Sequence, residues 1–410
     1  MSLEIVLSLE NFSTEILLTI FSYLPKRDLI SLKNVCTRFY KIVNHHWDVL
    51  LFNRRELYLV TNQCSDYIQK RSRKLLAPFE KHRISNNWKV GRYKESSIYL
   101  SRAFITQFYL EKNSIWIGKG GCIKCCQRVG NTINMHRAKY KLHGYNHTEV
   151  CKFVVRNNYV TTVNRDCLRL FSLQKRGYTS VINFKEMSMS SVDMESNVVV
   201  IGSKDGAVQL FKISQDSDLI PSEKIEYDDR IWSLALNENT LAAGTAANKS
   251  RICIFVKDIE SGQSLHKFYA NKYGAGILHL KWQSPFVLWS GGYDYCLKRW
   301  DLRLGQCVQT FLDPCASKIN CFDYDLINTV ITGCNDSRAT LWDVRKDKYV
   351  QIYYMESASR SRRRSPIQSI AFDAEHLFAA TDLHMNILDF SVIKGGIQDY
   401  SEIFSTQLVI

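Results

Sequence analysis

The chain has 410 residues, of which 45% are hydrophobic and 23% charged, and it carries a formal net charge of +14. This length allows one large all-β domain with a small companion, or two or three ordinary domains. The longest apolar runs are strand-sized, which excludes a membrane-spanning helix, and the first ten residues lack the basic segment of a signal peptide. Scattered cysteines favour a reducing compartment, so we expect a cytoplasmic or nuclear protein.

Residues 7–50 show the spacing of short amphipathic helices. Ser13 or Thr14 is a plausible N-cap, and apolar residues recur at helical intervals until Pro25 stops the pattern. Two further helices are expected before Trp47. A segment of this size lies near the lower limit for a self-sufficient core, and its helices carry more apolar faces than so small a bundle can bury. The segment therefore predicts a second protein that covers the remainder.

These residues resemble an F-box. The resemblance is carried by Glu15-Ile16-Leu17, Ile20-Phe21-Ser22-Tyr23-Leu24, Asp28-Leu29, Leu32, Val35-Cys36, Phe39-Tyr40 and Trp47. One departure is Phe12-Ser13, where the family has Leu-Pro. The resemblance implies docking on the Skp-type adaptor of a cullin-based ubiquitin ligase, the SCF complex. It implies that the adaptor-facing residues come from Phe12, Ile16, Leu17, Ile20, Leu24, Leu29, Leu32 and Val35. Which of them face the adaptor and which face the module's own core stays open.

A basic helical linker is expected over residues 51–87. Apolar residues share one helical face in its first half, and Pro78 breaks the pattern. Residues 51–95 hold eleven Lys and Arg against four Asp and Glu. The bases between Lys70 and Lys74 are expected on a solvated helix face, with a nuclear-localisation signal as the alternative.

From residue 100 onward one pattern recurs, and seven consecutive units fit between about 88 and 392. A short apolar strand leads into a small-residue strand, a tight turn and a third strand that ends in an aromatic residue. The turn residues recur at intervals of 39 to 46, at Gly121, Asp166, Asp205, Asn248, Asp294, Asp336 and Asp382. This period is typical of propeller blades, so we expect a mainly β fold with one closed seven-bladed β-propeller over residues 88–410.

The third strands carry the aromatic residue six positions after the turn Asp. Asp205 precedes Phe211, Asp294 precedes Trp300, and Asp336 precedes Trp342. These pairs resemble the WD-repeat family, and the Trp-Asp dipeptide itself stands at 300–301 and 342–343. We interpret the six residues as structural, with the Asp bonding neighbouring backbone amides and the aromatic packing between blades. An F-box followed by such a propeller resembles the F-box/WD-repeat substrate receptors.

Ring closure requires a strand from one end of the chain to pair with the other. The alternating segment 87–93 is expected to form the outer strand of the last blade, and residues 397–409 compete for the same place.

A basic connection at residues 355–366 is the candidate substrate surface. It carries Arg360, Arg362, Arg363 and Arg364, which can engage a phosphate or carboxylate, and a disordered loop is the alternative. By repeat register, Arg230 and Lys318 are expected beside it at the mouth of the ring.

No catalytic motif, metal site or cofactor site is expected. Cys122, Cys125 and Cys126 lack a second ligand pair at zinc-finger spacing. We therefore expect a non-catalytic substrate receptor, with the adaptor bringing cullin and RING subunits and the propeller binding an acidic or phosphorylated target protein. The alternatives are a WD-repeat scaffold outside any ligase and, less favoured, a basic RNA-binding propeller.

Overall fold

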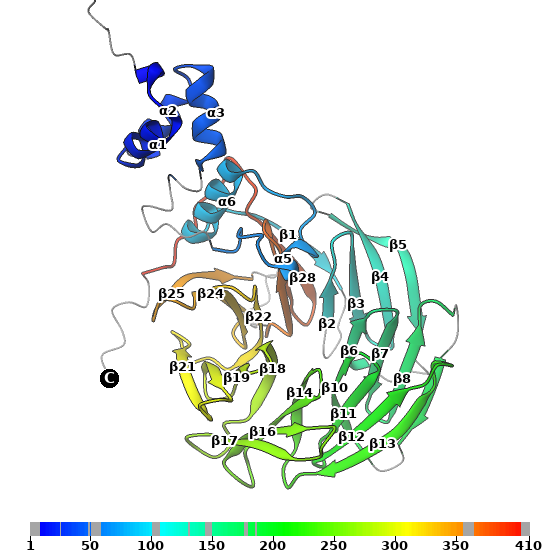
Figure 1. The fold of residues 1–410 in the computed structure, drawn as a ribbon. Helices are drawn as coiled ribbons and strands as arrows, with labels where there is room; N and C mark the ends of the chain where they lie inside the picture. Colours follow the sequence, from blue (N-terminus) through cyan, green and yellow to red (C-terminus); the bar gives the residue numbers. More distant parts are fainter. Residues whose placement is uncertain are drawn as a thin grey trace, which may run out of the picture.

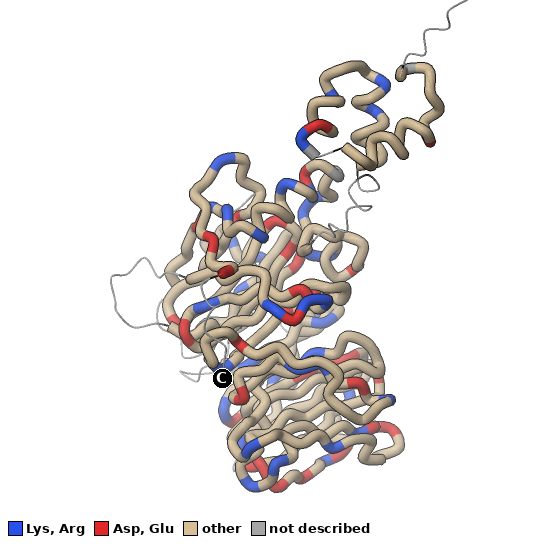
Figure 2. The backbone as a smooth tube through the Cα atoms, turned by 90° about the vertical axis from the view of Figure 1, so that its left-hand side faces the viewer, with Lys and Arg blue, Asp and Glu red and all other residues tan. Residues whose placement is uncertain are grey.

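Seven four-stranded antiparallel sheets form a closed ring, and a small group of helices projects beyond its rim (Figures 1 and 2). The computed structural model describes residues 9–24, 26–47, 50, 59–100, 107–129, 132–143, 150–175, 179–184, 187–355 and 365–402. The sequence expectation of a mainly β, seven-bladed propeller behind a helical segment is confirmed.

In blades 1 to 6 the strands follow sequence order from the centre of the ring outward, whereas the outermost strand of blade 7, β1, precedes all the other strands in the chain. Blades 1 to 6 are β2–β5, β6–β9, β10–β13, β14–β17, β18–β21 and β22–β25, and blade 7 is β26–β28 with β1. The strands of blades 1 to 3 are β2 (Gln107–Leu110), β3 (Ser114–Lys119), β4 (Cys122–Val129), β5 (Thr132–His143), β6 (Val150–Arg156), β7 (Tyr159–Asn164), β8 (Cys167–Ser172), β9 (Thr179–Asn183), β10 (Met189–Glu195), β11 (Val198–Ser203), β12 (Ala207–Ile213) and β13 (Leu219–Glu226). Those of the other blades are β14 (Ile231–Asn237), β15 (Thr240–Thr245), β16 (Ile252–Asp258), β17 (Ser264–Tyr269), β18 (Ile277–Ser284), β19 (Val287–Gly292), β20 (Cys296–Asp301), β21 (Gln306–Leu312), β22 (Ile319–Tyr324), β23 (Thr329–Cys334), β24 (Arg338–Asp343), β25 (Tyr349–Tyr354), β26 (Ser369–Phe372), β27 (His376–Ala380), β28 (His384–Asp389) and β1 (Lys94–Tyr99).

Burial along the strands explains why the sheets stack face to face. Second strands such as β19 and β23 are buried throughout, whereas the outer strand β21 is largely exposed. A Cβ atom on Gly291 would come within 2.8 Å of Ile319 Cγ2 in the next blade. The small residue at this position therefore lets adjacent blades approach closely.

The recurring aromatic residues lie between blades. Trp342 belongs to a buried cluster with Trp289 of the preceding blade, and its Nε1 donates to Thr332 Oγ1 at 3.1 Å. Trp300 Nε1 likewise donates to Ser290 Oγ at 2.8 Å.

The turn carboxylates of the same repeats have three different kinds of partner. Asp336 Oδ2 accepts from Arg338 Nε at 2.6 Å. Asp294 pairs with Lys298 at the same distance and also accepts from the Cys296 amide at 3.3 Å. Asp205 accepts from the Ser188 amide.

Ring closure uses a different segment from the one predicted. β1 pairs with β28 and is the outer strand of blade 7, so the expectation for residues 87–93 was wrong. Residues 87–90 instead end helix α6 (Pro78–Val90), and the left-handed backbone of Gly91, with φ of 65°, terminates the helix. Residues 397–402 contribute an isolated bridge from Ile397 to Arg92, and 403–409 lie outside the described residues.

The helices precede the ring. They are η1 (Leu9–Asn11), α1 (Thr14–Ser22), α2 (Lys26–Leu32), α3 (Thr37–His45), α5 (Asp66–Gln69) and α6. Pro78 begins α6, as proline at the first helical position can, and Glu80 caps the Ala77 amide. The predicted basic helix face at 70–74 was wrong, because α5 ends before it and Arg71 is buried. Among the described helices none is long and apolar enough to cross a membrane.

Candidate functional site

The helical module, residues 9–50, has a core of its own. The Ser13 hydroxyl caps α1 by accepting from the Ile16 amide, and the Cys36 thiol caps α3 by accepting from the Phe39 amide. The buried residues are Leu17, Phe21, Leu29, Phe39, Ile42, Val43, Trp47 and Leu50. At Phe12, where the F-box resemblance departs from its family, Arg38 Nη2 donates to the backbone carbonyl at 2.7 Å. This bond ties the start of the module to α3.

The module also exposes apolar side chains. Tyr23 is 82% exposed, Val35 63% and Ile16 47%, and Tyr40 and Ile30 are exposed as well. Full burial of a Val or Ile side chain contributes about 1.5–3 kcal/mol, so covering the exposed parts of Val35 and Ile16 would be favourable. The module is therefore only partly covered within this chain.

Helix α6 joins the module to the propeller. The buried Trp47 ring packs against Phe79 and His82, with ring centroids 5.9 and 6.1 Å apart. At the other end of α6, Trp88 stacks on Phe390 with centroids 3.7 Å apart, and its carbonyl accepts from the Tyr353 hydroxyl at 2.6 Å. Two tryptophans thus hold the two modules to one short helix.

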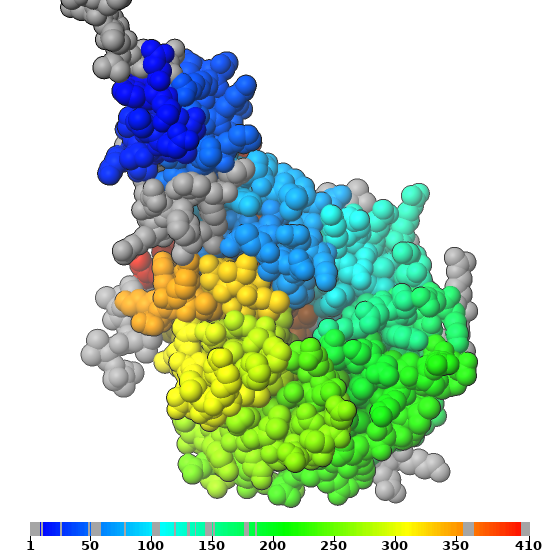
Figure 3. All heavy atoms as spheres, in the orientation of Figure 1, coloured from blue at the N-terminus to red at the C-terminus, as the bar shows by residue number. Residues whose placement is uncertain are grey.

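The segment between the module and α6 reaches the central channel of the ring. Its light-blue residues cover part of the ring face in Figure 3. Arg71 Nη1 pairs with Asp323 Oδ2 at 2.5 Å, and the Tyr67 hydroxyl donates to Asp323 Oδ1 at 2.6 Å. Lys281 Nζ lies 2.6 Å from both the Tyr67 oxygen and Asp323 Oδ1. Although burial opposes the charged form, Arg71 and Lys281 hold the pKa of Asp323 well below its usual value.

The channel has a volume of about 1050 Å³ and is lined by the first strands of the blades. One end of the channel lies beside the turns that join the first and second strands of each blade, and it contains the Arg71–Asp323 cluster. The opposite end lies beside the Asp-bearing turns and contains Lys204, Arg230 and Lys318. We call this opposite end the channel mouth, and its lining is basic.

Aromatic rings accompany the cations of the mouth. Trp232 packs on Tyr293 with ring centroids 5.1 Å apart, and Lys318 Nζ lies 4.8 Å from the centre of the Tyr293 ring. Within the described residues, neither Lys204 nor Arg230 forms an ion pair, and both are exposed. The mouth can therefore offer unneutralised cations next to aromatic surface.

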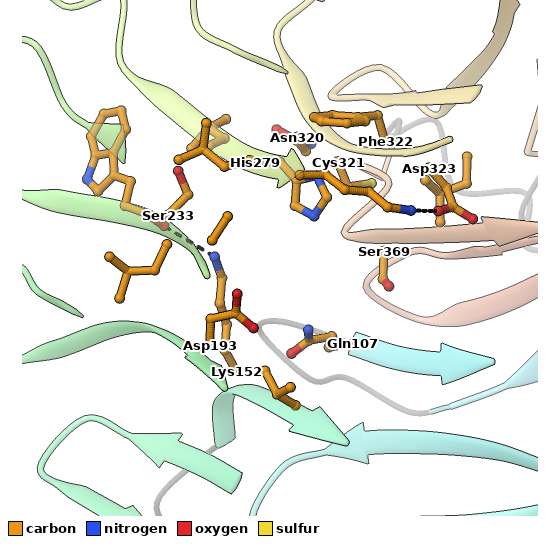
Figure 4. Close-up of a pocket in the computed structure, with 18 of the residues that line it drawn as sticks. Gln107, Lys152, Asp193, Ser233, His279, Asn320, Cys321, Phe322, Asp323 and Ser369 are labelled. Atoms are coloured by element: carbon orange, nitrogen blue, oxygen red, sulfur yellow. Dashed lines mark hydrogen bonds and ion pairs between the residues drawn. The ribbon is translucent and has the colours of Figure 1, made fainter. Parts of the chain in front are cut away.

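Asp193 and His279 lie deeper in the channel, and the pKa values of both are shifted (Figure 4). Burial raises the pKa of the Asp193 carboxyl to about 6, although backbone amides of Met194 and Leu236 bond its oxygens. Burial also lowers the pKa of His279 to about 3, and the nearby Lys152 and Lys281 act in the same direction. The side chains of Asp193 and His279 are both half-buried. At neutral pH His279 is uncharged and Asp193 carries the negative charge.

Comparisons with known proteins agree with this architecture. The F-box-like family model matches residues 14–52. The chain is 26% identical to human (Homo sapiens) F-box/WD repeat-containing protein 4 over 385 residues, which cover 92% of this chain and 91% of that protein. It is 25% identical to the mouse (Mus musculus) protein of the same name over 76% of this chain and 77% of that one. Over most of its length the chain is therefore similar to F-box/WD-repeat proteins.

A solved structure supports the fold alone. The crystal structure of the computationally designed Ika8 protein matches with a TM-score of 0.52 at 18% identity, covering 71% of this chain and 98% of that one.

The predicted site residues fall into separate groups. In the helical module, Leu17 and Leu29 lie in the core, Phe12, Ile20, Leu24 and Leu32 are partly buried, and Ile16 and Val35 are exposed. Arg230 and Lys318 both line the channel mouth. Arg360, Arg362, Arg363 and Arg364 lie outside the described residues, as does Pro25.

Sequence reasoning missed several residues of these sites. Lys204 stands in the turn between β11 and β12, and its position next to the Asp of a recognised turn could have identified it. Arg71 and Asp323 carried no such signal, because 252 residues separate them. Within the described residues no group of three or more His, Cys, Asp or Glu side chains could hold a metal ion.

Proposed function

We propose that this protein is the substrate-recognition subunit of an SCF ubiquitin ligase. In this proposal the F-box module docks on a Skp-type adaptor, the propeller binds a target protein, and the cullin and RING subunits recruited through the adaptor bring the ubiquitin-transferring machinery. The chain itself performs no chemical step and contributes by proximity, in the cytoplasm or the nucleus. The observation that carries the proposal is a partly covered F-box module fixed through Trp47 and Trp88 to a propeller with a basic mouth.

The adaptor surface is proposed to centre on Ile16 and Val35. Val35 is largely exposed and Ile16 half-exposed, and neither belongs to the buried core of the module. Phe12, Ile20, Leu24 and Leu32 are half-buried and extend the surface, whereas Leu17 and Leu29 support it from inside. The exposed Tyr23 and Tyr40 add amphipathic area of the kind that interfaces favour.

The channel mouth is proposed to receive the target. Arg230 and Lys318, together with Lys204, favour an acidic or phosphorylated segment, because charge-assisted hydrogen bonds to such groups are strong. The Trp232–Tyr293 pair offers apolar area beside them.

Co-purification with the adaptor and cullin tests the docking half of the proposal. We expect Ile16→Asp with Val35→Asp to abolish recovery of both proteins, because the change places two charges in an apolar interface. The exposed pair Ile220→Asp with Leu304→Asp is the matched control and should leave recovery unchanged. Equal recovery with both variants would refute adaptor docking through this surface. Recovery of the adaptor without the cullin would instead indicate a WD-repeat scaffold that acts outside any ligase.

Ubiquitin-remnant profiling after proteasome inhibition tests the other half of the proposal, the binding of the target protein at the channel mouth. Arg230→Glu with Lys318→Glu should remove a set of ubiquitinated proteins that the wild type yields, while adaptor binding persists. An unchanged set would exclude the channel mouth as the target site.

A further inference from the structure

The turn between β15 and β16 in blade 4 differs from the corresponding turns of the other blades. It spans six residues, 246–251, whereas the others span two or three. Five of the seven turns carry an Asp, but blade 4 has Asn248 at that position and the bases Lys249 and Arg251 after it. The side chains of both bases are exposed. Blade 4 therefore presents cations where most blades present a carboxylate.

Hydrogen bonds hold this turn in place. The loop that joins β17 to β18 lies along it, and the Gly274 amide of that loop donates to the Ala247 carbonyl at 2.7 Å. The buried carboxylate of Asp229 accepts hydrogen bonds from the backbone amides of Asn248 and Lys249. The backbone of the two loops is thus fixed, so their exposed side chains extend from a set frame.

The loop between β17 and β18 adds exposed aromatic rings. Tyr273 is 65% exposed, and Tyr269, the last residue of β17, is 60% exposed. Within the described part of the chain, neither ring stacks on another aromatic ring or lies under a cation. The exposed Lys272 stands between them in the sequence, and its Nζ lies 5.2 Å from the centre of the Tyr295 ring. Two free aromatic faces thus accompany the bases.

These exposed charged and aromatic side chains form what we call the blade 4 strip: Lys249, Arg251, Tyr269, Lys272 and Tyr273. Among the described residues, none of its three bases forms an ion pair. The loop that precedes β14 adds one exposed acid, Asp228, and one exposed base, Arg230. The strip therefore keeps a positive charge.

The strip continues inward to the channel mouth. The Ala246 amide at the start of the turn donates to the carbonyl of Arg230, which lines the mouth, at 3.0 Å. A Cβ atom on Gly276, at the end of the other loop, would come within 2.5 Å of the Trp232 ring. In Figure 1 blade 4 lies across the ring from the helical module. A ligand on the strip would therefore leave the proposed adaptor surface free.

We propose that the blade 4 strip binds a single strand of nucleic acid. Its phosphates pair with Lys249, Arg251 and Lys272, and its unpaired bases stack on Tyr269 and Tyr273. A basic surface with free aromatic faces is the usual combination for binding single strands. The net charge of +14 adds a general attraction for a polyanion. An acidic polypeptide matches the charge too, but every nucleobase has a face that can stack, whereas acidic side chains have none. The proposal does not depend on the ligase role.

The salt dependence of binding tests the phosphate contacts. Fluorescence anisotropy with the full chain and a labelled dodecamer of oligouridylate gives the slope of log affinity against log salt concentration. Lys249→Ala, Arg251→Ala, Lys272→Ala should make this slope shallower by about 2, because each phosphate contact to a single strand contributes about 0.7. The triple variant Lys212→Ala, Lys348→Ala, Lys394→Ala removes the same charge at exposed sites outside blade 4 and should leave the slope nearly unchanged.

Two pairs of substitutions test the stacking. Tyr269→Leu with Tyr273→Leu keeps apolar area but removes the aromatic faces, so affinity for oligouridylate should fall about tenfold or more. Tyr269→Phe with Tyr273→Phe keeps the faces and should bind within about twofold of the wild type. Circular dichroism and thermal melting establish that the variants fold, and Tyr273→Leu alone replaces the pair if the pair does not.

Three results would overturn the proposal. The first is an equal salt slope for the two triple variants, and the second is equal affinity of the Leu and Phe variants. The third is tighter strip-dependent binding of an oligoglutamate peptide of the same charge, which would make the strip a site for acidic polypeptides.

Discussion

Trp47, the last aromatic residue of the F-box module, meets Phe79 of α6 edge-on, and Lys33 Nζ lies 4.6 and 4.7 Å from the centres of the two rings. This three-residue joint fixes the base of the module on the arm that leads to the propeller. In the proposed ligase the target must be held at a set distance from the transfer machinery, so we expect the stiffness of this joint to affect ubiquitin transfer.

Phe79→Ala should loosen the joint without disrupting either module. Phe79 is 43% exposed, so we expect a loss of about 1 kcal/mol in unfolding free energy. Adaptor binding should persist while ubiquitination by the reconstituted ligase slows. Leu75→Ala, at an exposed linker position, is the control. Unchanged ubiquitination by the Phe79 variant would show that the joint does not set the geometry.

Asp323→Asn should destabilise the protein by about 3–5 kcal/mol, because it leaves the buried Arg71 and the half-buried Lys281 without their counter-charge. Adding Arg71→Met and Lys281→Met should recover much of the loss. Urea unfolding measures both changes, and a single variant as stable as the wild type would contradict the assigned role of the cluster.

The same carboxylate predicts a pH dependence. Because the pKa of Asp323 is depressed in the folded protein, its stabilisation is complete above its unfolded value of about 4 and is lost as the pH falls further toward the folded value. The difference in unfolding free energy between wild type and Asp323→Asn should therefore shrink as the pH decreases below 4. A constant difference between pH 7 and pH 3 would argue against the depressed pKa.

Asp193 predicts a second pH effect, on binding to the channel mouth. Its pKa of about 6 means that it loses its negative charge as the pH falls from 7 to 5, while His279, with a pKa of about 3, stays neutral. The channel then becomes more positive by one charge. A labelled oligoglutamate peptide should bind roughly two- to fourfold more tightly at pH 5 than at pH 7. Asp193→Asn should remove this difference, and its persistence would assign the titration to another group.

Gly91→Ala should destabilise the protein by about 2–3 kcal/mol. The residue has φ of 65°, and a Cβ atom there would come within 2.1 Å of the Gln398 carbonyl oxygen. Gly262 has a similar φ of 71°, but a Cβ atom there would meet no neighbouring atom. Gly262→Ala therefore measures the backbone strain alone and should lower the unfolding free energy by less than Gly91→Ala does. Thermal unfolding of the two variants tests the difference, and equal losses would exclude the steric contribution.

The amino-acid sequence by itself determined the repeat, the number of blades and the small helical module. These features rest on local spacing, because the turn Asp, the aromatic residue six positions later and the helical apolar period all lie within one short segment. For the same reason, Arg230 and Lys318 could be assigned to one end of the ring from repeat register alone.

Only the tertiary structure decided which strand closes the ring and how the modules are joined. Residues 87–90 alternate as a strand would, but Pro78, Glu80 and Gly91 start and end a helix there, and Trp88 gains a stacked partner in Phe390. Asp323 likewise depends on Arg71, far away in the chain. Such pairings depend on packing between segments that are distant in the sequence, and the local periodicity of a sequence does not predict them.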